Sequence, residues 1–152
     1  MSNTQLLKMT LFDACTAFVN KREDEILSTI KSHQAALASE TKSSAGDKHE
    51  TGRAMLQLEM EKAGKQLNGV YEMRQVLSKI GQNRMEQKAR LGSLVVTDIG
   101  SYYLAISAGE IKIDEASYFA VSTDSPIGKL LLGTTSGDQI YFRREIEIID
   151  VV

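Results

Sequence analysis

Apolar positions in roughly the first eighty residues recur at the spacing of three and four that is typical of an amphipathic helix. They form two stripes, and the only proline of the chain, Pro126, lies well beyond both. The second stripe alternates steps of three and four almost throughout, which is the pattern of a coiled-coil seam. The first stripe contains Leu11, Cys15, Phe18, Ile26, Ile30, His33 and Leu37 with Arg22 as a polar interruption, and the second contains Leu56, Met60, Ala63, Leu67, Val70, Met73, Leu77 and Ile80.

A polar segment, residues 42–52 (KSSAGDKHETG), separates the two stripes. Two long helices joined by a polar turn predict an antiparallel two-helix coiled-coil hairpin over residues 1–81, with its tip near 42–52. Gly81 is expected to end the second helix, and residues 82–91 are expected to form a linker. The alternative is that both stripes are core positions of helices that pack on a sheet or in a dimer.

The period of the hydrophobic pattern changes to two from Gly92 onward, which predicts short strands. One segment departs from this pattern: Ser125 offers an N-cap, Pro126 the first helical position and Gly133 a terminating glycine, so a short helix is expected. Residues 92–152 therefore predict a small β-rich domain with one short helix, and the chain as a whole is of the α+β class. The expected strands are LVVT, YYLAIS, IKID, SYFAVS, QIYF and EIEIIDV.

The composition, with 42% hydrophobic and 25% charged residues, is that of a folded globular protein and not of a disordered chain. No apolar run approaches the roughly 18 residues of a membrane span, and the N-terminus lacks a signal-peptide pattern. The single cysteine, Cys15, cannot form an internal disulfide. We therefore expect a cytoplasmic protein without membrane contact.

The formal net charge of −2 is divided unevenly along the chain. Residues 1–89 carry 13 Lys and Arg against 11 Asp and Glu, whereas residues 90–152 carry 5 against 9. This asymmetry is too mild for a sequence-specific binder of duplex DNA. It fits a protein that attaches to another protein and directs a more basic arm toward nucleic acid, and it fits a chance distribution equally well.

Two short motifs resemble the Gre-type (GreA/GreB family) bacterial transcription elongation factors. The run Gly46-Asp47-Lys48-His49-Glu50 resembles the tip of their helical hairpin, where a Gly-Asp pair is followed three residues after the Asp by a Glu. The run SPIGKLLLG, residues 125–133, with Gly137-Asp138 downstream, resembles the helix and following turn of their C-terminal domain. The resemblance implies an FKBP-like fold for residues 92–152, after a hairpin in the same order as here.

The resemblance also implies a partner and an activity. Gre-type factors insert their hairpin through the secondary channel of RNA polymerase and stimulate cleavage of backtracked RNA at its 3′ end. Asp47 and Glu50 would then assist the polymerase active site by sharing one Mg²⁺, with no cofactor bound to the isolated protein. The protein itself would not be an enzyme, because the polymerase supplies the rest of the active site.

One position departs from the family pattern. Family tips carry a second Glu three residues after the first, whereas this chain has Arg53 there, within Thr51-Gly52-Arg53-Ala54. An alternative is therefore a regulator that occupies the secondary channel without stimulating cleavage.

The tip residues also have a purely structural interpretation. Acids at a helix N-terminus favour the helix dipole, and Asp47 with Glu50 can form a capping box. Lys42, Lys48 and Arg53 are candidates for contact with RNA phosphates, a role that requires no base sequence, or they are simply solvated.

The resemblance assigns polymerase docking to Asp124, Ser125, Pro126 and Ile127, whose structural alternative is a helix cap followed by a core isoleucine. A monomer is the oligomeric state that this mode of action implies. An alternative from another class is a coiled-coil adaptor or homodimer whose stripes close on a second copy.

Other chemistry finds little support. His33 and His49 lie well apart in a hairpin unless His33 is close to its turn, and the chain offers no paired ligand spacing for zinc. A nucleophilic Cys15 would need a neighbouring histidine base, so a small apolar filler is the expected role.

Overall fold

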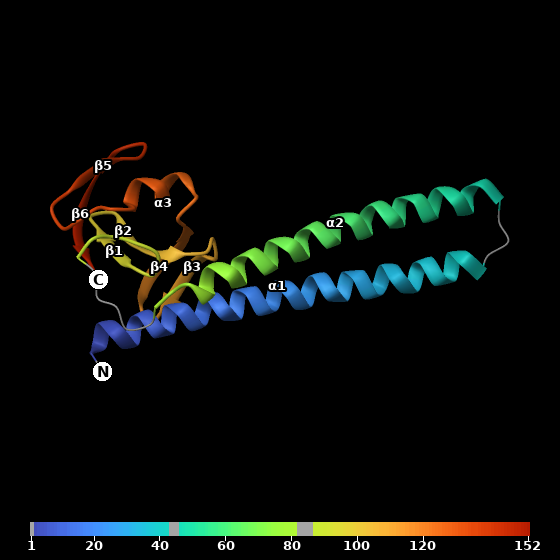
Figure 1. Cartoon of the computed structure of the whole chain (residues 1–152), viewed down its shortest axis with the longest axis horizontal. Helices are drawn as coiled ribbons and strands as arrows, with labels where there is room; N and C mark the ends of the chain where they lie inside the picture. Colours follow the sequence, from blue (N-terminus) through green and yellow to red (C-terminus); the bar gives the residue numbers. More distant parts are fainter. Residues whose placement is uncertain (1, 43–45, 82–86) are drawn as a thin grey trace. The chain divides into compact units, whose positions relative to one another are not determined.

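The computed structural model describes the backbone of residues 2–42, 46–81 and 87–152, and their side chains outside residues 40–50 (Figure 1). Two long helices are followed by a β-rich region with one short helix, which confirms the α+β class. The elements are α1 (Asn3–Lys42), α2 (Gly46–Ser78), β1 (Leu94–Thr97), β2 (Gly100–Ala105), β3 (Gly109–Ile113), β4 (Ala116–Ser122), α3 (Pro126–Leu131), β5 (Gln139–Tyr141) and β6 (Glu145–Val151).

The chain divides into two compact units. The hairpin unit contains Val19–Met73, and the β-rich unit contains Met1–Phe18 together with Arg74–Val152. The beginning of α1 and the end of α2 therefore belong with the sheet, and residues 1–81 are shared between the two units. The predicted domain boundaries thus differ from the way in which the structure groups these residues.

The hairpin unit consists of two antiparallel helices that lie side by side (Figure 1). Its buried side chains are Val19 and Ile26 in α1 and Ala63 and Val70 in α2. Each pair is seven residues apart, which is the heptad repeat that keeps one helix face toward its partner. In α1 the buried position is Val19, a residue that the sequence interpretation left out of the stripe in favour of Phe18.

The tip is shorter than the sequence predicts. Helix α1 ends at Lys42 and α2 begins at Gly46, whereas the polar segment suggested a turn over residues 42–52. Polarity indicates exposure to water, and it does not by itself interrupt a helix that has no proline. The other end of α2 is closer to expectation, because the Lys79 and Ile80 N–H groups bond to carbonyls three residues back, as in a tightened last turn.

A capping box begins α1. The Gln5 N–H donates to Ser2 Oγ at 3.1 Å, and the Ser2 N–H donates to Gln5 Oε1 at 3.0 Å. Two of the N–H groups that would lack a helical partner are thereby satisfied.

All six predicted strands are present, and together they form a sheet of order β3-β4-β2-β1-β6-β5. Neighbouring strands pair antiparallel, except that β2 and β4 run parallel, with Ser101 opposite Tyr118 and Ala105 opposite Ser122. The register between β1 and β6 shifts at Val96 and Thr97. The predicted strands QIYF and EIEIIDV are the hairpin of β5 and β6 at one edge.

The two faces of the sheet are covered by different parts of the chain. One face carries the main core, to which α3 and the segment before β1 contribute; its buried members are Ala89, Val95, Leu104, Leu131, Ile148 and Val151. The other face carries Tyr103, beside which Met9 and Phe12 of α1 lie. The first turns of α1 are therefore part of the core of the β-rich unit.

Ala89 lies within the segment that the sequence suggested as a linker. Its N–H donates to the Thr134 carbonyl at 2.8 Å, and its carbonyl accepts from the Gly133 N–H at 2.7 Å. This backbone exchange joins the segment before β1 to the loop after α3. Residues 82–86 of the same segment lie outside the described residues.

Candidate functional site

The acidic tip motif falls at the beginning of α2. The helix starts at Gly46, so the backbone of Asp47 and Glu50 is helical and Asp47 lies inside the first turn, not before it. The side chains of Lys42, Asp47, Lys48 and Glu50 lie outside the described residues, so their roles remain predictions. Arg53 is described, and its side chain is exposed.

The predicted docking loop is held to the end of β4 by the serine that caps α3. Ser125 Oγ accepts from the Gly128 N–H at 3.1 Å and donates to the Ser122 carbonyl at 2.6 Å. The same Ser122 carbonyl accepts from the Ser125 N–H at 3.1 Å. The predicted N-cap is confirmed, and Pro126 occupies the first turn of the helix as expected.

The close approach of α3 to β4 explains why the motif continues with a glycine, Gly128. A Cβ atom added there would lie 1.9 Å from the Ser122 carbonyl oxygen, far inside van der Waals contact. Only a residue without a side chain allows α3 to approach β4 so closely. Gly128 is therefore required by local packing, as Ser125 is by capping.

The four docking candidates divide into two kinds. Ser125 caps the helix, and Ile127 packs against the main core, so both have structural roles. Asp124 and Pro126 are exposed and are the members of this set that a partner can reach. Nearby, Leu130 of α3 and its C-cap residue Leu132 are large apolar residues that are 39% and 40% exposed.

The downstream Gly137-Asp138 pair also has a structural role. Asp138 Oδ2 accepts from the Thr135 N–H at 2.8 Å, which closes a tight turn. Gly137 has a φ of +93°, a conformation that suits glycine, and its N–H donates to the Ile148 carbonyl. The pair therefore directs the chain from α3 into the sheet.

Cys15 is fully buried in the β-rich unit. Burial raises the pKa of its thiol to about 11, and a backbone hydrogen bond from Ile106 opposes this rise only in part. A thiol that stays protonated at neutral pH is a poor nucleophile. His33 is partly buried in α1, and the described residues contain no group of three or more His, Cys, Asp or Glu placed to hold a metal ion.

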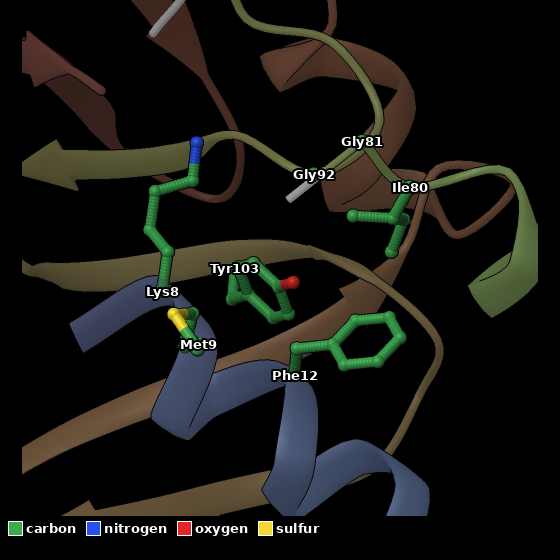
Figure 2. Close-up of a pocket in the computed structure, with 7 residues that line it drawn as sticks. All are labelled: Lys8, Met9, Phe12, Ile80, Gly81, Gly92 and Tyr103. Carbon is green, nitrogen blue, oxygen red and sulfur yellow. The ribbon is translucent and has the colours of Figure 1, made fainter. Parts of the chain in front are cut away.

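The described part of the β-rich unit includes a small cavity and an open cleft. A cavity of about 10 Å³ lies beside Tyr103 (Figure 2), and this volume is too small for any substrate. An open cleft of about 640 Å³ follows the β5–β6 hairpin and is lined mainly by polar and charged residues such as Arg144 and Glu147. Ligand pockets are mostly apolar, whereas the lining of this cleft is mainly polar and charged.

Across the described residues, no helix combines the length and the apolar character that crossing a membrane requires.

No protein-family model matches the chain. No curated protein matches it either. Among solved structures, a similar one is described as "Structure of the transcription factor Gfh1". Its sequence is 18% identical, 92% of each chain is covered, and the TM-score is 0.33. A likeness at this level assigns neither a family nor a function.

Proposed function

We propose that this chain binds bacterial RNA polymerase and stimulates the polymerase's own cleavage of backtracked RNA. One observation carries this function: the Gly46–Glu50 motif that resembles a Gre-type tip stands at the start of the second helix of a two-helix hairpin. A second feature supports it, since the Ser-Pro-Ile motif forms a capped helix on a β-rich domain that follows the hairpin in the chain.

The chemistry of the tip suits a shared Mg²⁺ ion. Residues three apart in a helix lie on the same face, so the carboxylates of Asp47 and Glu50 can be presented together. Mg²⁺ prefers oxygen ligands and commonly takes one or two carboxylates from a protein. When bound, the ion supplies activation of the attacking water. Asp47 and Glu50 would hold and orient it, and two carboxylates alone would retain it weakly.

Positive charge near the tip supports contact with RNA. Lys42, Lys48 and Arg53 stand within a few residues of the two acids in sequence. Phosphate contacts of this kind add affinity without reading the base sequence, which suits a factor that acts on any transcript. The RNA 3′ end, held by the polymerase, is the expected target.

A backtracked elongation complex with labelled RNA tests this function directly. The wild-type protein should shorten the RNA from its 3′ end, and Asp47→Ala with Glu50→Ala should abolish the shortening. Glu59→Ala with Glu61→Ala is the matched control, because it removes two acids farther along α2 and should leave cleavage unchanged. Wild-type protein that binds polymerase without shortening the RNA would refute cleavage.

The non-cleaving regulator has one specific observation in its favour. Arg53 is exposed and lies three residues after Glu50, on the same helix face. A guanidinium there can neutralise the carboxylate that the metal needs. Arg53→Glu separates the two roles: cleavage that appears only in this variant identifies the wild type as a channel-occupying regulator.

Docking through the α3 loop requires its own measurement. Asp124→Lys reverses an exposed charge at this loop and should weaken polymerase binding by roughly tenfold, equivalent to about 1.4 kcal/mol. Glu115→Lys makes the same reversal in the exposed β3–β4 turn and should leave the affinity within about twofold. Equal losses in both variants would indicate a non-specific charge effect in place of a docking site.

The adaptor or homodimer also has a specific observation behind it. Leu27, Met55 and Leu58 of the hairpin unit are large apolar residues with exposed fractions of 46%, 64% and 64%. Sedimentation equilibrium decides this point. A monomer at micromolar concentration agrees with the polymerase-binding role, and a tight dimer that Leu58→Lys dissociates would favour the adaptor.

A further inference from the structure

The cavity beside Tyr103 is lined by the hydroxyl group of a buried tyrosine. Tyr103 is only 1% exposed, and it is one of the largest fully buried side chains. Its hydroxyl points into the space between Phe12 and Ile80 (Figure 2). Among residues 2–42, 46–81 and 87–152, which the structure describes, nothing forms a hydrogen bond with this hydroxyl.

A buried hydroxyl without a partner is unfavourable, because it loses its bonds to water and gains none in return. Burial raises the pKa of Tyr103, and the nearby Cys15 and Asp13 raise it further. The group therefore remains a neutral hydroxyl at neutral pH. A neutral hydroxyl donates one hydrogen bond and accepts others. Phenylalanine would fill the same space without burying a polar group. The presence of the hydroxyl therefore indicates that it has a hydrogen-bond partner.

The volume of the cavity identifies the class of partner. At about 10 Å³ the space is near the lower limit for one water molecule and far below that for an organic ligand. A buried water needs two to four polar neighbours. Besides Tyr103, the lining includes Ile80 and Gly81, and in the described part of the chain neither the Ile80 carbonyl nor the Gly81 N–H has a partner.

We propose that this cavity binds one ordered water, which bridges Tyr103 Oη to the backbone of Ile80 or Gly81. The water joins the end of α2 to β2 inside the β-rich unit. It also gives a hydrogen-bond partner to a backbone group of Ile80 or Gly81, which follow the last turn of α2. This site is independent of polymerase binding and of the tip acids.

Crystal structures of the wild type and of Tyr103→Phe, at a resolution that orders internal waters, test the site. The wild type should show one water within about 3.2 Å of Tyr103 Oη, and the variant should lack it. An empty wild-type cavity overturns the assignment. A direct bond from Tyr103 Oη to a protein atom overturns it as well.

Thermal unfolding supplies a measurement in solution. If the water bridges the hydroxyl, Tyr103→Phe should leave the Tm unchanged or lower it by a few degrees. A rise in Tm would show that the hydroxyl was unsatisfied and would overturn the assignment. Tyr141→Phe is the matched control, because Tyr141 is 69% exposed in the same unit and its hydroxyl is already solvated.

Discussion

The hairpin unit and the β-rich unit are stabilised in different ways. The hairpin unit buries small or medium side chains at heptad spacing along one seam, such as Val19, Ile26 and Val70. The β-rich unit buries side chains on both faces of a sheet, including Tyr103 and Leu104. In the first unit a repeating pattern is sufficient, and many residues of similar size satisfy it. In the second, individual residues are determined by contacts between segments far apart in sequence.

Matched leucine substitutions should give the largest difference between the units. Leu104→Ala, in the main core, should lower the free energy of unfolding by about 2–5 kcal/mol because it leaves a cavity. Leu67→Ala, at a partly buried seam position, should cost about 1 kcal/mol. Urea unfolding can follow both units, since four of the five tyrosines report on the β-rich unit and circular dichroism reports on the helices. Equal losses of unfolding free energy in the two variants would contradict the difference between the units.

Gly128→Ala should have the next largest effect. The added methyl group collides with the Ser122 carbonyl, so either α3 or β4 must shift, at a cost of about 1–3 kcal/mol. Thermal unfolding measures the loss. Lys129→Ala, at the next and exposed position, serves as the control and should stay within about 0.5 kcal/mol of the wild type. An unchanged stability of Gly128→Ala would mean that the helix is not held as tightly as the contact indicates.

Cys15 makes the β-rich unit sensitive to alkali. The folded-state pKa of about 11 lies above the ordinary value of 9.0, so the native thiol keeps its proton where the unfolded one has lost it. Stability from this group is complete below pH 9 and should decline as the pH rises toward 11. Cys15→Ala should reduce the slope of unfolding free energy against pH in this interval. A slope that matches the wild type would exclude the thiol as its source.

The smallest expected effect is a gain of stability in the hairpin unit. Gly64 lies inside α2, and an added Cβ there would meet no atom within 4 Å. Gly64→Ala should therefore stabilise the helix by up to about 1 kcal/mol. Gly92→Ala is the contrasting control, because Gly92 has a φ of +92° and its added Cβ would lie 3.0 Å from Ile80. If Gly64→Ala and Gly92→Ala change stability by the same amount, the two units do not differ in their tolerance of an added methyl group.

Hydrophobic spacing was sufficient to predict the long helices and the six strands, and capping residues were sufficient to predict the short helix. The signals involved are local: Ser125, Pro126 and Gly133 act within a single turn, and alternation within a strand spans only a few residues. The second stripe was predicted correctly at Ala63 and Val70. The first was predicted correctly at Leu11, Cys15 and Ile26, but Val19 and not Phe18 is the buried residue of that adjacent apolar pair, and only the partner helix decides which of the two faces inward.

For the candidate site, the sequence indicated the motifs, and the structure shows why some of their residues are needed for folding. The roles of Ser125 as a cap and Ile127 as a core residue, both foreseen as alternatives, are observed. The requirement for Gly128 was not foreseen, since it depends on the carbonyl of Ser122, six residues earlier in another element. The surroundings of the Tyr103 hydroxyl likewise depend on residues of α1 and on Ile80 and Gly81 after α2, which meet β2 only after folding.

By itself, the sequence determined which segments become helices and strands and where the short helix is capped. Only the tertiary structure decided that the first turns of α1 and the segment around Ala89 belong to the core of the sheet. The physical reason is that periodicity shows which face of an element avoids water. It does not show which other element covers that face, because this depends on distant parts of the chain meeting in space.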